Sequence, residues 1–77
     1  MATKTIPAAF GKVLRELRER AGLSQEELAD AADLDRTYVS MLERARRQPT
    51  LETLFRIAAA LGVAPATLVA RTAAELQ

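Results

Sequence analysis

Apolar residues recur along this chain at the three- and four-residue spacing typical of helices that bury one face. The clearest stripe consists of Phe10, Val13, Leu14, Leu17 and Ala21. It predicts a first helix from Pro7 to Gly22, because proline suits the first turn of a helix and glycine commonly ends one. Residues 1–6 precede the stripe and are expected to form a flexible arm.

Helix boundary signals predict four further helices. The stretch SQEE has the spacing of a capping box, which predicts a second helix over 25–32. After a turn near Asp33, a residue type that tolerates positive φ, a third helix is predicted over 36–44 with Asp35 as its N-cap.

Thr50 and Gly62 bound a fourth helix, and a fifth is predicted over 64–76. The fourth helix is expected to bury Leu51, Leu54, Ile57, Ala58 and Leu61. No linker or repeat divides the chain. The pattern therefore predicts one all-α domain of five helices over residues 1–77.

Composition agrees with a small helical domain. Hydrophobic residues make up 49% of the 77 residues but aromatic residues only 4%, and a sheet would use more aromatic and β-branched side chains. A chain of this length is near the ~70–80-residue limit at which one core supplies only a few kcal/mol. A second copy packed against it would help, so we expect a homodimer.

The residue types that the chain lacks argue against several classes of function. The chain has no Cys and no His, which excludes disulfides, thiol nucleophiles, imidazole bases and the common zinc sites. No loop holds a cluster of acids suited to a carboxylate metal site. No apolar run approaches ~18–20 residues, and residues 1–10 lack the apolar region of a signal peptide. We therefore expect a cytoplasmic protein that is not an enzyme, with no cofactor, metal, membrane partner or evident small-molecule ligand.

The net charge of +1 conceals an uneven distribution. Residues 26–35 hold five acids and no basic residue: Glu26, Glu27, Asp30, Asp33 and Asp35. Residues 36–47 hold four arginines, Arg36, Arg44, Arg46 and Arg47, and one acid, Glu43, which we expect to pair with Arg15 or Arg18. A basic patch on a nearly neutral chain indicates a nucleic-acid interface.

The second and third helices, joined by a tight turn, form a helix-turn-helix in the general sense. Val39 and Leu42 give the third helix only a narrow apolar edge, so its other face is expected to be exposed. That face carries Arg36, Thr37, Ser40 and Met41. An arginine there could donate two hydrogen bonds to a guanine, worth about 1–3 kcal/mol of discrimination.

Residues 23–54, LSQEELADAADLDRTYVSMLERARRQPTLETL, resemble the helix-turn-helix of the lambda-repressor-like Cro/C1-type (XRE) family of transcription regulators. The resemblance extends over roughly residues 9–70, and LDRTYVSMLER is most similar to the controller proteins of restriction–modification systems. It implies a five-helix domain, usually dimeric, whose third helix enters the DNA major groove. The implied function is sequence-specific regulation of transcription by a homodimer that binds a pseudo-palindromic operator in double-stranded DNA. The implied location is the cytoplasm of a bacterium, at the nucleoid, for a protein of bacterial or phage type.

The resemblance also assigns roles to individual residues. Those that would read bases are Arg36, Thr37, Ser40 and Met41. Those that would contact the DNA backbone or flank it are Ser24, Gln25, Tyr38, Arg44, Arg46 and Arg47. Alternatives stay open: Arg44 could pair within the chain, the loop arginines could simply be solvated, and Met41 could touch a thymine methyl or crowd the groove.

The chain departs from the family pattern at Ala45, where many members have glycine. A left-handed alanine costs roughly 1 kcal/mol, so the third helix is expected to end differently or to run on slightly.

The C-terminal helix is the predicted dimer contact, through Val69, Thr72, Ala73 and Leu76. The alternative is a frayed tail whose apolar residues cap the core. A second function also remains open: an antitoxin or other protein-interaction module of the same fold, in which the last two helices bind a partner protein.

Overall fold

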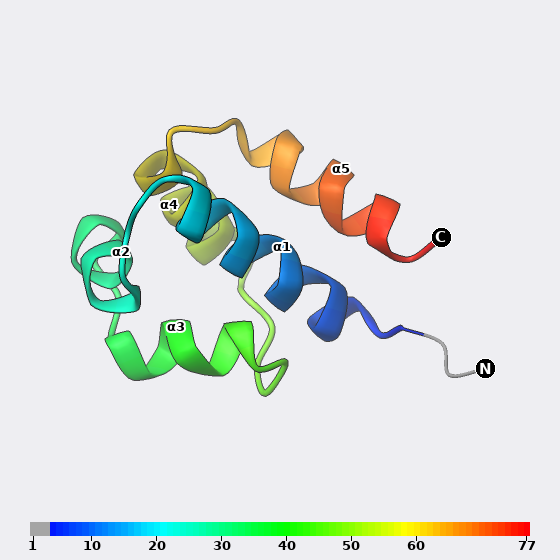
Figure 1. Ribbon diagram of the computed structural model, residues 1–77, viewed down its shortest axis with the longest axis horizontal. Helices are drawn as coiled ribbons and strands as arrows, with labels where there is room; N and C mark the ends of the chain where they lie inside the picture. Colours follow the sequence, from blue (N-terminus) through cyan, green and yellow to red (C-terminus); the bar gives the residue numbers. More distant parts are fainter. Residues whose placement is uncertain (1–3) are drawn as a thin grey trace.

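The computed structural model describes residues 4–77 and, within them, an all-α domain without strands, as the sequence predicted. The helices are α1 (Ile6–Arg20), α2 (Gln25–Ala32), α3 (Arg36–Glu43), α4 (Leu51–Leu61) and α5 (Pro65–Glu75). α1 packs against both α3 and α5, α2 packs against α3 and α4, and α4 packs against α5 (Figure 1). The helix-turn-helix formed by α2 and α3 is thus held against the rest of the domain from two sides.

The predicted N-terminal arm lies only partly within the described residues. Residues 1–3 lie outside the described residues, but α1 already begins at Ile6, with Thr5 as its N-cap. Lys4 Nζ lies 2.7 Å from Glu75 Oε1, and Lys12 Nζ lies 3.1 Å from the same oxygen. Hydrogen bonds from Lys4 and then Lys12 hold the pKa of Glu75 below its usual value. These ion pairs join the start of α1 to the end of α5.

One apolar core contains residues from all five helices. Its largest fully buried side chains are Leu14, Leu28, Leu42, Ile57, Leu68, Val13 and Val39. Phe10 and Leu17 complete the predicted stripe of α1, but Ala21 is exposed because α1 ends at Arg20. The core therefore follows the helical periodicity except at the helix ends.

Leu51 contradicts the sequence prediction, because 72% of its surface is exposed. Ile57 and Ala58 are buried and Leu54 is partly buried, so α4 does bury the stripe that the spacing indicated. α4 packs against α2 and α5, and its first turn is left uncovered by both. Phe55, one helical turn after Leu51, is also 54% exposed.

Two helix ends beside α3 adopt the left-handed conformation without glycine. Asp33 has φ 57° and Ala45 has φ 62°. After α3, the amide of Ala45 donates to Leu42 O (3.2 Å) and that of Arg46 donates to Met41 O (2.8 Å), which is a Schellman motif. The expectation that α3 avoids a left-handed Ala45 was therefore wrong, since the hydrogen bonds of this motif outweigh the local strain.

Replacing Ala45 by glycine should stabilise the domain by up to about 1 kcal/mol, because glycine removes the steric cost of a positive φ. Urea unfolding followed by circular dichroism would measure the change. Asp33→Gly is the matched control and should gain less, because aspartate tolerates this conformation better. A loss of stability in the Ala45 variant would show that Ala45 is not strained.

Candidate nucleic-acid interface

α3 has a buried side and an exposed side. Val39 and Leu42 are both 0% exposed and anchor the helix in the core. Arg36 and Thr37 are exposed, whereas Ser40 and Met41 are half-buried on the outer surface, so the predicted base-reading residues do share one free face. Their contact with DNA remains a prediction.

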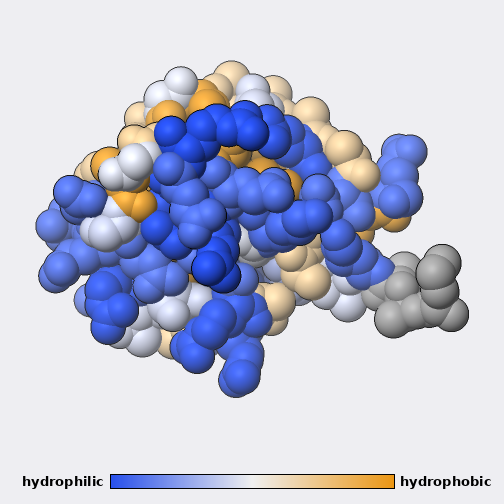
Figure 2. All heavy atoms as spheres, in the orientation of Figure 1, coloured by the Kyte–Doolittle hydropathy of each residue, from blue (hydrophilic) through white to orange (hydrophobic). Residues whose placement is uncertain are grey.

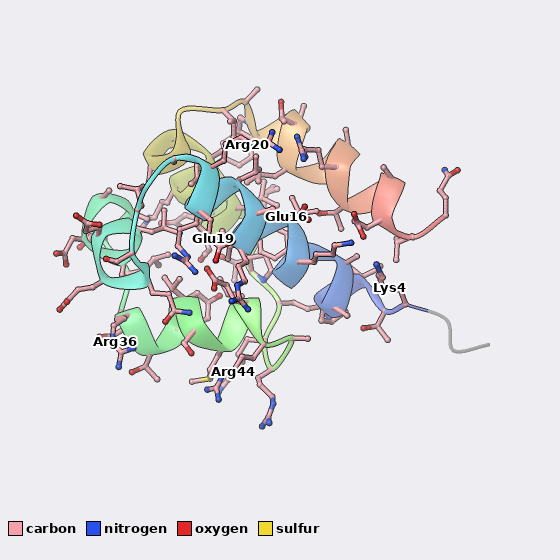
Figure 3. The ribbon with its side chains drawn as sticks, in the orientation of Figure 1. Lys4, Glu16, Glu19, Arg20, Arg36 and Arg44 are labelled. Atoms are coloured by element: carbon pink, nitrogen blue, oxygen red, sulfur yellow. The ribbon has the colours of Figure 1, made fainter. Side chains whose placement is uncertain are left out.

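Arg36 and Arg44 lie at opposite ends of α3 and point away from the domain (Figure 3). Arg46 and Arg47 follow in the loop and are also exposed. Within residues 4–77 none of these four arginines forms an ion pair, although Arg15 pairs with Glu19 at 3.3 Å. Four cationic groups are therefore free to meet an anionic surface along one edge of the molecule.

Tyr38 joins α3 to the loop that carries Arg46 and Arg47, called the basic loop below. Its ring packs against the core, and its hydroxyl donates a long hydrogen bond of 3.4 Å to the carbonyl oxygen of Gln48. The ring thus lies at the edge of the core, and the hydroxyl lies beside the loop that carries Arg46 and Arg47. Asp35 occupies the N-cap position of α3, but its side chain makes no capping hydrogen bond.

The start of α2 lies close to the end of α3. Ser24 Oγ accepts from the amide of Glu27 at 3.0 Å, and Glu27 Oε1 accepts from the amide of Ser24 at 2.8 Å, which confirms the capping box. The first amides of a helix lack intrahelical partners and favour anions. Gln25, the first residue of α2, is half-buried next to them.

A buried ion pair links these elements. Arg18 Nε donates to Glu43 Oε2 at 2.5 Å and Arg18 Nη2 donates to Glu43 Oε1 at 3.0 Å, and only 11% and 4% of the two side chains are exposed. Gln25 Nε2 donates to the same Glu43 Oε1 at 3.0 Å. The hydrogen bonds with Glu43 raise the pKa of Arg18. The expected partner of Glu43 is thus Arg18 and not Arg15.

Gly11 explains how α1 approaches α3. A Cβ atom placed on Gly11 would lie 2.7 Å from the carbonyl oxygens of both Leu42 and Glu43. The backbones of the two helices are therefore in direct contact at the last turn of α3. Gly11 was not predicted to have a role, although a glycine within a helical pattern can indicate close packing.

The predicted dimer residues of α5 do not all reach the surface. Val69 is 55% exposed and Leu76 is 39% exposed, but Thr72 is 9% exposed and its hydroxyl donates to Leu68 O at 2.7 Å. Thr72 therefore faces the core. Phe55 on α4, which was not among the predicted residues, is 54% exposed.

Apolar surface is unevenly distributed. In Figure 2, hydrophilic residues cover α1 and the region around α2, whereas apolar residues gather along the upper rim, where α5 lies. A shallow apolar groove of about 190 Å³ opens between the start of α1, the loop after α3, α4 and α5. A second apolar hollow is lined by Leu51, Glu52 and Phe55.

The described residues hold no group of three or more acidic, cysteine or histidine side chains that could bind a metal ion. No single helix in residues 4–77 is long and apolar enough to cross a membrane. α4 and α5 reach that length and composition only when counted together, and they meet at a bend of 104°.

Comparison with known proteins identifies the arrangement. A family model described as Helix-turn-helix matches residues 14–68. The control protein C.BamHI of Bacillus amyloliquefaciens is 41% identical over 68 residues, which cover 87% of this chain and 84% of that protein.

Two solved controller proteins have the same fold. The restriction–modification controller protein C.AhdI from Aeromonas hydrophila is 45% identical, with a TM-score of 0.79 over 80% of this chain and 94% of that one. The restriction–modification controller protein C.Esp1396I, solved as a tetramer with its natural 35 base-pair operator, is 31% identical, with a TM-score of 0.82 over 92% of this chain and 93% of that one.

Proposed function

Because this chain belongs to the helix-turn-helix family of the Cro/C1 type, we propose that it is a sequence-specific regulator of transcription that binds double-stranded DNA through α3. The observation that carries the proposal is the exposed face of α3, with free arginines at its end and in the loop that follows. The likeness to C.BamHI and C.AhdI favours a regulator of the controller type. Such a protein acts at the nucleoid, in the cytoplasm.

We expect two kinds of DNA contact. Arg36, at the entering end of α3, would offer its guanidinium fork to a guanine, while Thr37, Ser40 and Met41 line the base edges beside it. Ser24 and Gln25 would meet one phosphate at the start of α2. The arginines after α3, Arg44, Arg46 and Arg47, would neutralise others.

A homodimer would place two such surfaces on one operator, and we propose that its contact is formed by Leu51 and Phe55. These two side chains lie four residues apart on α4, are both more than half exposed, and form one hollow. They follow the basic loop directly, so contact there brings the ends of two α3 helices toward each other. This assignment replaces α5 as the main contact, because Thr72 is buried and Leu76 stands at the helix end.

The DNA-binding proposal is tested by Arg36→Ala, after an operator has been selected in vitro from random DNA. Loss of a bidentate guanine contact should cost about 1–3 kcal/mol on that operator and much less on random DNA. Fluorescence anisotropy titrations at several salt concentrations would measure the affinity for the operator and for random DNA.

Arg47→Ala is the matched control, because Arg47 is also exposed but lies in the loop. If it contacts only phosphate, it should weaken binding to all sequences alike and lower the salt slope by about one unit. Equal losses on operator and random DNA for Arg36→Ala would contradict its base-reading role.

A further inference from the structure

We propose that Glu43 is a positioning residue: paired with Arg18, it holds Gln25 and the start of α2 in the geometry required by a DNA phosphate. The inference rests on the proposed function. The side chain of Glu43 is only 4% exposed and so would not touch DNA; it acts through Gln25.

The network joins three helices at one carboxylate. Arg18, near the end of α1, donates two hydrogen bonds to Glu43, the last residue of α3, and its Nη1 donates to Leu23 O at 2.8 Å. Gln25, the first residue of α2, donates to the same carboxylate. The position of α2's first turn relative to α3 is thus fixed by side chains that are held from several directions.

Glu43 also decides which way the Gln25 amide faces. A carboxylate only accepts hydrogen bonds, so the NH₂ group of Gln25, and not its carbonyl oxygen, must lie against Glu43. One N–H of that group is used in the 3.0 Å hydrogen bond. The second N–H remains free to donate, and Gln25 is only half-buried. A phosphate oxygen, which accepts hydrogen bonds, matches that free donor.

Holding Gln25 in the free protein favours DNA binding. A free glutamine side chain loses much rotamer freedom when it becomes ordered at an interface. Here the ordering has already occurred on folding, because Gln25 is bound to a carboxylate that is itself held by a two-point contact. Buried ion pairs can often be replaced by apolar residues without loss of stability, so the effect of this pair on DNA binding can be tested separately from folding.

The test is a double-mutant cycle on operator affinity. Arg18→Met/Glu43→Met removes the network, keeps similar volume and leaves the net charge unchanged. We expect it to weaken operator binding about tenfold, the size expected for one hydrogen bond to a charged group. Gln25→Ala should have a similar effect in the native background but less than about twofold when added to the double variant.

Three results would overturn the inference while leaving DNA binding in place. The first is native operator affinity in the double variant, and the second is fully additive effects of the double variant and Gln25→Ala. The third is a salt slope about one unit lower in the double variant, which would mean that Arg18 itself contacts phosphate. If the native protein prefers no DNA sequence, the proposed function fails, and this inference with it.

A second variant keeps the test decisive if the double variant unfolds. Glu43→Gln retains the shape of the side chain and one acceptor oxygen. It should therefore bind the operator more tightly than Arg18→Met/Glu43→Met but less tightly than the native protein. Side-chain ¹⁵N relaxation of Gln25 Nε2 in the free protein is an independent measurement. The Gln25 side chain should be ordered in the native protein and more mobile in Glu43→Gln. Equal mobility together with native affinity would overturn the inference.

Discussion

Replacing Phe55 by glutamate should dissociate the homodimer and weaken operator binding by about 10²–10⁴-fold. Two linked half-site contacts gain affinity because the second forms within the complex, and this gain is lost when the subunits separate. The new carboxylate would face its own copy across the two-fold axis, beside Glu52. The monomer should stay folded, since Phe55 is already 54% exposed. Sedimentation equilibrium and titration of a full operator against a single half-site would measure both effects.

Val69→Glu is the control for this experiment. Val69 is 55% exposed, on α5, and so matches Phe55 in exposure but not in position. It should leave the dimer intact. If Val69→Glu dissociates the dimer and Phe55→Glu does not, the contact lies on α5, as the sequence first indicated.

Replacing Gly11 by alanine should destabilise the domain by about 1–3 kcal/mol. In an exposed helix the same change would be stabilising, because glycine costs about 1 kcal/mol relative to alanine. Here the new methyl group meets the carbonyl oxygens of Leu42 and Glu43 at 2.7 Å, and backbone atoms cannot rotate aside. The carbonyl of Leu42 also accepts a hydrogen bond from Ala45, so the end of α3 would be displaced. Urea unfolding would show the loss, and amide chemical shifts at Leu42 and Glu43 would show the displacement.

Ala70→Gly on the exposed side of α5 is the control for propensity alone and should cost about 1 kcal/mol or less. A stabilised Gly11→Ala protein would mean that α1 can move away from α3 without cost.

Periodicity and helix boundary residues were sufficient to predict the five helices, because each helix buries apolar residues and begins or ends beside a recognisable residue type. The capping box at Ser24, the turn at Asp33 and the end at Gly62 were all confirmed. The exposure of Leu51 was not predictable, because the spacing of apolar residues shows which of them share a helix face but not whether another helix covers that turn.

The network around Glu43 was only partly predictable. An ion pair with Arg15 or Arg18 followed from charge alone, but the choice between them depends on how α1 crosses α3. Gly11 sets that crossing, and its effect depends on backbone atoms more than thirty positions away in sequence. Left-handed Ala45 was mispredicted because the two hydrogen bonds that stabilise it are a property of the folded turn.

The ion pairs of Glu75 with Lys4 and Lys12 give the chain almost the topology of a ring. The start of α1 and the end of α5 leave the domain on the same side (Figure 1). A short peptide joining Lys4 to Glu75 would close the backbone without moving either helix. Such closure removes conformations from the unfolded chain, so a cyclised form of this domain should gain stability and keep the exposed face of α3.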